Sequence, residues 1–577
     1  MSIHQIKHLS LPIFAAALFF ILNCSSPAAQ EQQAAIEISY ANDPEGRWVD
    51  SVFNGLSADE RLGQLFMIRA HSDKGAEHIA SVENLIKKYH VGSLCFFQGT
   101  PEKQVELVNR YQALSAKVPL MVAIDGEWGL GMRMAATTMS FPRQLMLGAI
   151  SDDELIYDMG KEIARQLLRT GVQVNFAPVA DVNNNPANPV IGFRSFGEDR
   201  ANVTAKSLQY MKGMQDNGVM ACAKHFPGHG DTDVDSHFDL PVIRHKQARL
   251  DSVELYPFQE LFRQGVGSVM VAHLHIPALD DRPNRSTTLS RNTVTTLLKE
   301  KMGFDGLVFT DALEMEGVAK YHKNGETEAE ALLAGNDVLV LPKDIGVALS
   351  TIKVYLKDGR LKQNELDASV KKVLRAKYRL GLTKFTPIPV KGLQQDLHTA
   401  EAELLRKNLI QNSLTLVRNT GKLLPVKNDP NIIAVTIGAK DNPPFSANLG
   451  NIPSIHVPAE PTDEAQQSLL ATLKSSSLVI ISLHGMTNSA SKNFGISANA
   501  REFIAAIARQ NKVALVVFGN PYSLKFFDNI GCVLEAYDED PLTQESAGAV
   551  ITGNLPTKGR LPITASAESA YGAGVVK

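Results

Sequence analysis

Cysteine is scarce in this chain, which has four cysteines among 577 residues. Cys95, Cys222 and Cys532 lie far apart in sequence, each within an apolar, strand-like stretch. None of these spacings is that of paired zinc ligands. We therefore expect buried thiols, and we expect neither a disulfide framework nor a zinc site.

The chain also lacks an excess of charge of either sign, with 58 basic and 61 acidic residues and a formal net charge of -3. A nucleic-acid-binding domain needs a basic surface, so this balance argues against a nucleic-acid partner. No GxGxxG or Walker loop is present, and we expect no nucleotide or other cofactor. Hydrophobic residues make up 44% and charged residues 21%, as in ordinary globular enzymes.

Long apolar runs are lacking except near the N-terminus, between Leu9 and Leu22. This run is short for a transmembrane helix but suits the core of a signal peptide. The tetrapeptide Ile21-Leu22-Asn23-Cys24 resembles a bacterial lipobox, although Asn23 replaces the usual small residue. We expect a signal peptide over 1–24, lipidation at Cys24, a polar linker over 25–45 and a periplasmic or outer-membrane-anchored protein. A plain export signal and a short membrane anchor are the alternatives.

Short apolar runs alternate with segments of helical length and period after residue 56. Eight such runs are candidate strands: Leu65–Ile68, Val91–Phe97, Leu120–Asp125, Val172–Ala177, Val219–Ala223, Ser268–Ala272, Leu307–Thr310 and Val338–Leu341. Eight β units over roughly 320 residues favour a (β/α)8 TIM-like barrel at 46–382, with an open doubly wound sheet as the alternative.

A Pro-containing segment without clear period predicts a linker over 383–400. The remainder, 401–577, again alternates strands and helices. Five candidate strands lie at Leu414–Val417, Ile432–Ile437, Leu478–Leu483, Val513–Phe518 and Val533–Ala536. This pattern predicts an open α/β sandwich domain, so the fold class is α/β with two domains.

Polar residues follow several of the predicted barrel strands, among them Asp125, Asp181, His273 and Asp311. The richest segment is 223–237, in which Lys224 and His225 follow an apolar strand and Gly228 and Gly230 shape a loop. Because the carboxyl ends of barrel strands meet on one face, we expect an active site there.

Metal chemistry fits this segment poorly. Asp231, Asp233 and Asp235 have the odd spacing of a calcium loop, but Ser236 replaces the turn glycine and Val242 the bidentate glutamate. His273 and His275 end about the sixth strand, whereas the histidine pair of metal-dependent amidohydrolase barrels ends the first. We therefore expect no metal.

Glycoside hydrolysis fits better, because it needs a carboxylate nucleophile and a proton donor on opposite sides of the anomeric carbon. Asp311 at a strand end is a suitable nucleophile. Asp235 and His237 form an Asp-x-His pair, in which a carboxylate orients an imidazole and raises its pKa toward neutrality. An imidazolium can then replace a second carboxylic acid as proton donor.

Several motifs together resemble the bacterial β-N-acetylglucosaminidases of glycoside hydrolase family 3. They are the segments 224–232 (KHFPGHGDT), 235–237 (DSH), 191–197 (IGFRSFG), 272–273 (AH), 309–311 (FTD) and, more weakly, 519–522 (GNPY) and 559–562 (GRLP). The resemblance implies a retaining, metal-free mechanism, with Asp311 as nucleophile and His237, held by Asp235, as acid and base. It assigns sugar binding to Asp125, Arg194, Lys224, His225 and His273.

The resemblance also implies the partners, which are β-N-acetylglucosaminide oligosaccharides or muropeptides. The segment 125–133 departs from the family's Asp-x-Glu-Gly-Gly-Arg pattern: Arg133 takes the place of the arginine from a shifted position, and Trp128 is either a sugar-stacking wall or a core residue. A β-glucosidase or glycoside phosphorylase of the same family is one alternative. A non-catalytic sugar-binding lipoprotein is the other.

Overall fold

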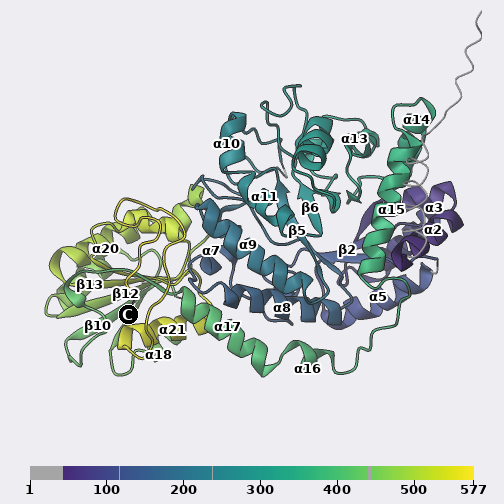
Figure 1. Ribbon diagram of the computed structural model, residues 1–577. Coiled ribbons are helices and arrows are strands. Elements are labelled where there is room, and N and C mark those ends of the chain that lie inside the picture. Colours follow the sequence, from purple (N-terminus) through teal and green to yellow (C-terminus); the bar gives the residue numbers. More distant parts are fainter. Residues whose placement is uncertain (1–42, 116, 237, 440–442, 577) are drawn as a thin grey trace, which may run out of the picture.

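Two β-sheets, each the centre of one domain, organise the chain (Figure 1). The computed structural model describes residues 43–115, 117–236, 238–439 and 443–576. The expected signal peptide, Cys24 and His237 therefore lie outside the described residues. No helix within the described ranges is both long enough and apolar enough to cross a membrane.

The first sheet is parallel, and its strands follow the order β7-β6-β5-β4-β3-β2-β1-β8. Its strands are β1 (Phe66–Ala70), β2 (Ser93–Phe96), β3 (Met121–Ile124), β4 (Val174–Asn175), β5 (Met220–Phe226), β6 (Ser268–Val271), β7 (Leu307–Thr310) and β8 (Leu339–Val340). The amide of Thr310 donates to the carbonyl of Val338 (3.1 Å), which joins β7 to the start of β8. The sheet is thus a nearly closed barrel, and the predicted TIM-like fold is confirmed.

Helices cover the outside of the barrel (Figure 1). The longer ones are α2 (Pro44–Gly55), α4 (Gly75–Tyr89), α5 (Pro101–Leu114), α8 (Glu154–Arg169), α9 (Arg200–Gln215), α11 (Tyr256–Arg263), η3 (Asn292–Lys301), α13 (Glu326–Ala334), α14 (Ile345–Lys357) and α15 (Gln363–Arg379). Ser57 caps the short helix α3 (Ala58–Gly63): its hydroxyl accepts from the Glu60 amide, while the Glu60 carboxylate accepts from the Ser57 amide. This capping box starts the first β/α unit.

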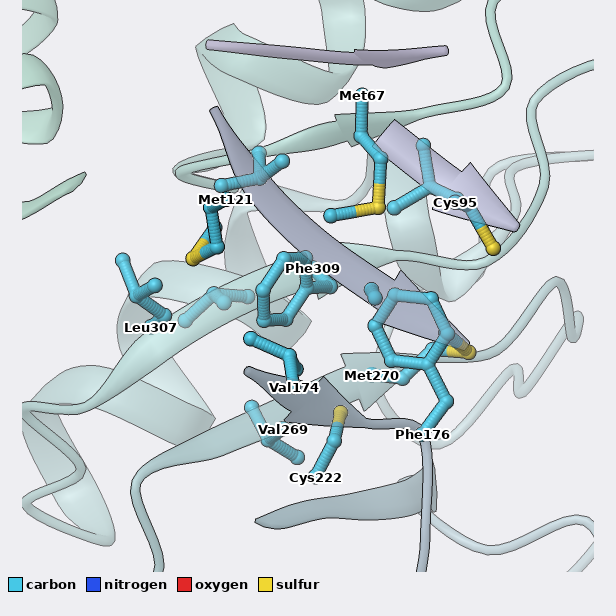
Figure 2. Close-up of a cluster of buried hydrophobic side chains, with 14 of the residues drawn as sticks. Met67, Cys95, Met121, Val174, Phe176, Cys222, Val269, Met270, Leu307 and Phe309 are labelled. Carbon is cyan, nitrogen blue, oxygen red and sulfur yellow. The ribbon is translucent and has the colours of Figure 1, made fainter. Parts of the chain in front are cut away.

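The barrel interior is filled by apolar side chains from opposite strands (Figure 2). Met67, Met121 and Phe309 meet near its centre, and Phe176 packs edge-on against Phe309 with ring centroids 5.3 Å apart. The thiols of Cys95 and Cys222 are buried, as predicted. The core therefore supplies a rigid apolar floor beneath the carboxyl ends of the strands.

We expected Lys224 and His225 where the strand gives way to a loop; strand β5 extends to Phe226, so both residues belong to the end of the strand. The Lys224 amide donates to Pro178 (3.1 Å), and its carbonyl accepts from the Ala180 amide (2.7 Å). The register against β6 shifts between Ala223 and Phe226. These backbone bonds hold two polar residues at the strand end.

The second sheet has the order β11-β10-β12-β13-β14-β9, in which only β9 is antiparallel among the described strands. Its strands are β9 (Thr415–Asn419), β10 (Ile432–Ile437), β11 (Ser454–Val457), β12 (Leu478–Leu483), β13 (Val513–Val517) and β14 (Cys532–Glu535). Alternate residues enter two separate apolar clusters, one on each face. The helices of this domain are α18 (Pro444–Ala447), α19 (Asp463–Leu473), α20 (Ala498–Gln510) and α21 (Pro541–Thr552). The predicted open sandwich is confirmed, with the added edge strand β11.

The two domains are connected by α16 (Leu393–Leu397) and α17 (Ala400–Ser413), which run along the outside of the barrel (Figure 1). The predicted linker 383–400 is thus partly helical. Its backbone is bound to the barrel, because Asn109 both donates to the Ile388 carbonyl (2.9 Å) and accepts from the Ile388 amide (2.8 Å).

Candidate active site

A cavity of about 550 Å³ opens at the carboxyl end of the barrel. Phe176 and Met270 from the apolar core form part of its floor. Of the sequence-predicted site residues, Asp125, Arg194, Lys224, His225 and Asp311 all line it. Residues that are far apart in sequence meet here because they follow or end four different barrel strands, β3, β4, β5 and β7.

A buried lysine connects two carboxylates at the centre of the cavity. Lys224 is 1% exposed, and its Nζ lies 2.8 Å from Asp125 Oδ1 and 2.8 Å from Glu127 Oε1. Burial lowers the pKa of a lysine, but Asp125 and Glu127 outweigh this and raise the pKa of Lys224 above its ordinary value. The two carboxylates therefore favour the charged ammonium form of Lys224.

Two arginines complete this network. Arg194, at the end of the 3-10 turn η1 (Gly192–Arg194), donates to Glu127 from Nε (3.0 Å) and Nη2 (2.6 Å). Arg133 donates to Asp125 Oδ2 (2.6 Å), so the shifted arginine reaches the site. Burial opposes ionisation of Glu127, yet Arg194 and Lys224 lower its pKa to about 2. Lys224 and Arg133 likewise outweigh burial and hold the pKa of Asp125 below its ordinary value.

His225 is oriented by Asp181, a fully buried carboxylate beyond the end of β4. His225 Nδ1 lies 2.7 Å from Asp181 Oδ2, and the His229 amide donates to Asp181 Oδ1 (2.7 Å). His225 Nε2 is 3.4 Å from Arg194 Nη2 on the cavity side. Burial, with His225 nearby, lowers the pKa of His229 to about 4, so His229 is a neutral part of the loop.

Asp311 follows β7 directly and differs from the other carboxylates of the cavity. Its carboxylate accepts from the Ala312 amide (2.8 Å), and within the described ranges no arginine or lysine forms an ion pair with it. Burial would raise its pKa, but the nearby His273 and His225 outweigh burial and keep the pKa below the ordinary value. Asp311 is thus an ionised carboxylate at the cavity, and no arginine or lysine of the described residues pairs with its oxygens.

His273 lies behind Asp311 and is completely buried. Its Nε2 is 3.0 Å from the Ala312 carbonyl and its Nδ1 is 2.7 Å from the Thr288 hydroxyl. Unlike the other predicted sugar-binding residues, His273 is not among the residues that line the cavity. From this position His273 supports the backbone that directly follows Asp311.

The loop that carries Asp235 crosses from β5 toward the segment after β7. The Gly317 amide, in α12 (Glu316–Ala319), donates to the Ser236 carbonyl (3.1 Å). Asp239 binds Lys320 Nζ (2.5 Å) and the Tyr321 hydroxyl (3.0 Å). Asp235 itself is half-buried, and Ser236 lines the cavity. Residues on both sides of position 237 are therefore hydrogen-bonded to the segment that follows Asp311.

The mouth of the cavity carries residues that sequence reasoning did not assign. Arg69, at the end of β1, forms an ion pair with Glu314, and its guanidinium lies 4.1 Å from the centre of the Phe97 ring. Glu127 and Asp181 were likewise unassigned, although each follows a predicted strand. A polar residue shortly after an apolar strand was the feature of the sequence that could have identified them. Their partners become adjacent only in the folded barrel.

The family model described as "Glycosyl hydrolase family 3 N terminal domain" matches residues 57–376. A β-hexosaminidase A of Pseudoalteromonas piscicida is 29% identical over 382 residues, which are 61% of this chain and 63% of that protein. The chain thus matches less than two thirds of that relative.

Two further relatives extend over the second domain. A protein of Cellulomonas fimi named β-N-acetylglucosaminidase/β-glucosidase is 24% identical over 550 residues, 90% of this chain and 95% of that protein. The structure of a family 3 β-N-acetylglucosaminidase from Paenibacillus has a TM-score of 0.75 at 29% identity and covers 89% of this chain and 99% of that one. The motifs, the fold and the family model agree, and the chain belongs to glycoside hydrolase family 3.

Proposed function

We propose that this protein is an exo-acting, retaining β-N-acetylglucosaminidase that removes terminal β-linked N-acetylglucosamine from peptidoglycan fragments or chitin oligomers. The observation that carries the proposal is the position of Asp311, an ionised carboxylate of the cavity with which no arginine or lysine of the described residues forms an ion pair. Its pKa is lowered by neighbouring histidines despite burial, so it is ready to attack an anomeric carbon.

In the proposed reaction Asp311 displaces the aglycone and forms a covalent glycosyl-enzyme. His237, charged by Asp235, gives a proton to the departing oxygen and then, as a neutral imidazole, activates the water that hydrolyses the intermediate. The role of His237 rests on the sequence motif. The bonds from Ser236 and Asp239 to the chain after Asp311 support it, because they hold the flanking residues near the nucleophile.

The charges of the cavity suit a neutral sugar. Four cationic and four carboxylate side chains line it: Arg69, Arg133, Arg194 and Lys224, with Asp125, Glu127, Asp311 and Glu314. All of these groups except Asp311 are paired with one another, and together they present both donors and acceptors to sugar hydroxyls without net charge. A strongly anionic or cationic substrate would gain less from this surface.

The names of the relatives support the N-acetylglucosamine specificity, since those of the Cellulomonas and Paenibacillus proteins refer to β-N-acetylglucosaminidase. The Cellulomonas name also includes β-glucosidase, which favours that activity as the second candidate. We also propose export and lipid anchoring through Cys24, on the basis of the lipobox-like segment.

Chromogenic β-N-acetylglucosaminide and β-glucoside, each with and without phosphate, test the proposal. We expect preferred turnover of the N-acetylglucosaminide, at a rate that does not depend on phosphate and with free sugar as product. Preferred turnover of the glucoside would support the second candidate, and a sugar phosphate product would indicate a phosphorylase. No turnover of either substrate by folded protein would contradict an enzymatic function.

A further inference from the structure

A second cavity, of about 320 Å³, lies between the barrel and the sandwich domain. Trp128 and Arg143 line it from the barrel, Arg406 from α17, and Asp538, Glu539 and Asp540 from the segment after β14. It shares no lining residue with the active-site cavity among the described residues. Its volume falls within the range of small-molecule sites, roughly 300–1,000 Å³.

The two cavities have a common wall. Glu127 faces the active site, while the next residue, Trp128, faces the interdomain cavity. Arg194 lines the active site, and the preceding residue, Phe193, packs under Arg143. The Arg143 guanidinium lies 5.3 Å from the Trp128 ring centre and 4.8 Å from that of Phe193. The interdomain cavity is therefore built directly behind the Arg194–Glu127 pair.

Most polar groups of this cavity already have partners. Arg406 donates to the Ser140 carbonyl (2.9 Å) and is paired with Asp540. Glu539 lies 3.2 Å from His484 Nδ1 and accepts from the Gly485 amide (2.8 Å). These pairs fix the shape of the cavity and neutralise much of its charge.

The side chains of Arg143 and Asp538 do not take part in these pairs. In the described part of the chain, the Arg143 guanidinium has ring contacts but no hydrogen bond or ion pair. Asp538 accepts from the Thr543 hydroxyl (2.8 Å) and the Asp540 amide (3.1 Å) at Oδ1, and no donor is found for Oδ2 within the described ranges. Burial raises the pKa of Asp538, in keeping with an incompletely satisfied carboxylate.

We propose that the interdomain cavity is a second saccharide-binding site that holds one pyranose unit. A guanidinium donor and a carboxylate acceptor together can bind neighbouring hydroxyls, and the indole of Trp128 offers an apolar surface to the C–H groups of the ring. The cavity is lined by two arginines and three carboxylates, so its charges nearly balance and an ionic ligand of either sign would gain little, which favours a neutral sugar. The choice of an N-acetylglucosamine oligomer as ligand rests on the proposed function.

Calorimetric titration with a chitin trisaccharide tests this site. The Asp311→Asn protein is used so that the ligand is not hydrolysed. We expect two binding events per chain. Arg143→Gln, added to this background, should weaken one of them about tenfold or more, since it removes a charged hydrogen-bond donor, and should leave the other unchanged. Arg360→Gln is the matched control, because Arg360 also stacks on a ring, Tyr355, on a remote part of the barrel.

Asp538→Asn provides a second variant, should Arg143→Gln fail to fold, and thermal melting checks both. A single event that survives both substitutions would overturn the second site while leaving the proposed function intact. A single event that both substitutions remove would support the second site but count against binding at the active site. No binding of the trisaccharide at all would contradict both proposals.

Discussion

The Arg194 guanidinium forms two hydrogen bonds, of 3.0 Å and 2.6 Å, with the carboxylate of Glu127, which is completely buried. Lys224 binds the same carboxylate from another side (2.8 Å). Glu127 thus fixes two of the cations that we assign to sugar binding. The Glu127 carboxylate itself is not exposed to solvent.

Glu127→Gln should therefore damage both activity and stability. It leaves two buried cations short of one negative charge, which we expect to lower the free energy of unfolding by about 3 kcal/mol. We also expect kcat/KM to fall about tenfold or more, because the sugar-binding cations lose their fixed positions. Urea unfolding and steady-state kinetics measure the two effects. Glu260→Gln, which breaks the surface pair with Arg263, is the control, and equal behaviour of the two variants would contradict this role.

His237→Ala should affect substrates according to their leaving groups. An alkyl or sugar aglycone needs protonation as it departs, whereas an activated aryl group does not. We expect kcat/KM to fall far more for a chitin disaccharide than for a nitrophenyl glycoside, by a factor of about 100 between the two. Similar losses on both substrates would argue against His237 as the acid.

The pH profile of kcat/KM should report the lowered pKa of Asp311. Activity requires the ionised carboxylate, so it is lost as the pH falls through that pKa, and the acidic limb lies below the range of an ordinary carboxyl group. His273→Gln removes the largest neighbouring influence that lowers this pKa, and the acidic limb should therefore move to higher pH. The basic limb should stay in place, since we assign it to His237. An unmoved acidic limb would show that His273 does not act on the nucleophile.

Lys377 gives a prediction for stability that is independent of catalysis. It is completely buried in α15, with the side-chain amide oxygen of Gln64 2.7 Å from its Nζ. Burial lowers its pKa from 10.5 to about 7. As the pH falls from about 10 to about 7, the unfolded chain takes up a proton that the folded protein does not, so the folded state loses stability over this range and the loss then levels off.

Lys377→Met removes this titration. We expect the free energy of unfolding of Lys377→Met to rise relative to that of the unaltered protein as the pH falls from about 10 to about 7, by up to about 4 kcal/mol. The lost hydrogen bond to Gln64 lowers the free energy of unfolding of the variant by about 1 kcal/mol. Denaturant unfolding at several pH values measures it. Lys362→Met, at the exposed start of the same helix, should show no such trend. A pH-independent difference for Lys377→Met would contradict the prediction.

The barrel was predictable from sequence because each of its strands is a short apolar run, buried on both sides. β11 was missed for the opposite reason: its residues are only partly buried and do not form such a run. The motifs likewise placed Asp125, Arg194, Lys224, His225 and Asp311 in one cavity. The apolar run indicated that the strand ends just before Lys224 and His225, because polar residues are unusual in a strand. Pairing with the chain at 178–180 extends the strand over both residues.

Partnerships across the barrel were beyond prediction from sequence. Asp181 reaches His225 and His229 because β4 and β5 are neighbours, and nothing in the local sequence of Asp181 indicates these partners. From the sequence, Trp128 was either a sugar-stacking wall or a core residue. The structure places it in the lining of the interdomain cavity, opposite residues 538–540, which are about 410 positions away in the sequence.

The most direct test of the central claim is to trap the reaction intermediate. A slowly hydrolysed fluorinated β-N-acetylglucosaminide should leave its sugar covalently attached to Asp311. We expect peptide mass spectrometry to find the adduct on the peptide that contains Asp311, and to find none in the Asp311→Asn protein. An adduct on a different carboxylate, or turnover of a natural substrate by Asp311→Asn at the rate of the unaltered protein, would contradict the assignment of Asp311 as the nucleophile.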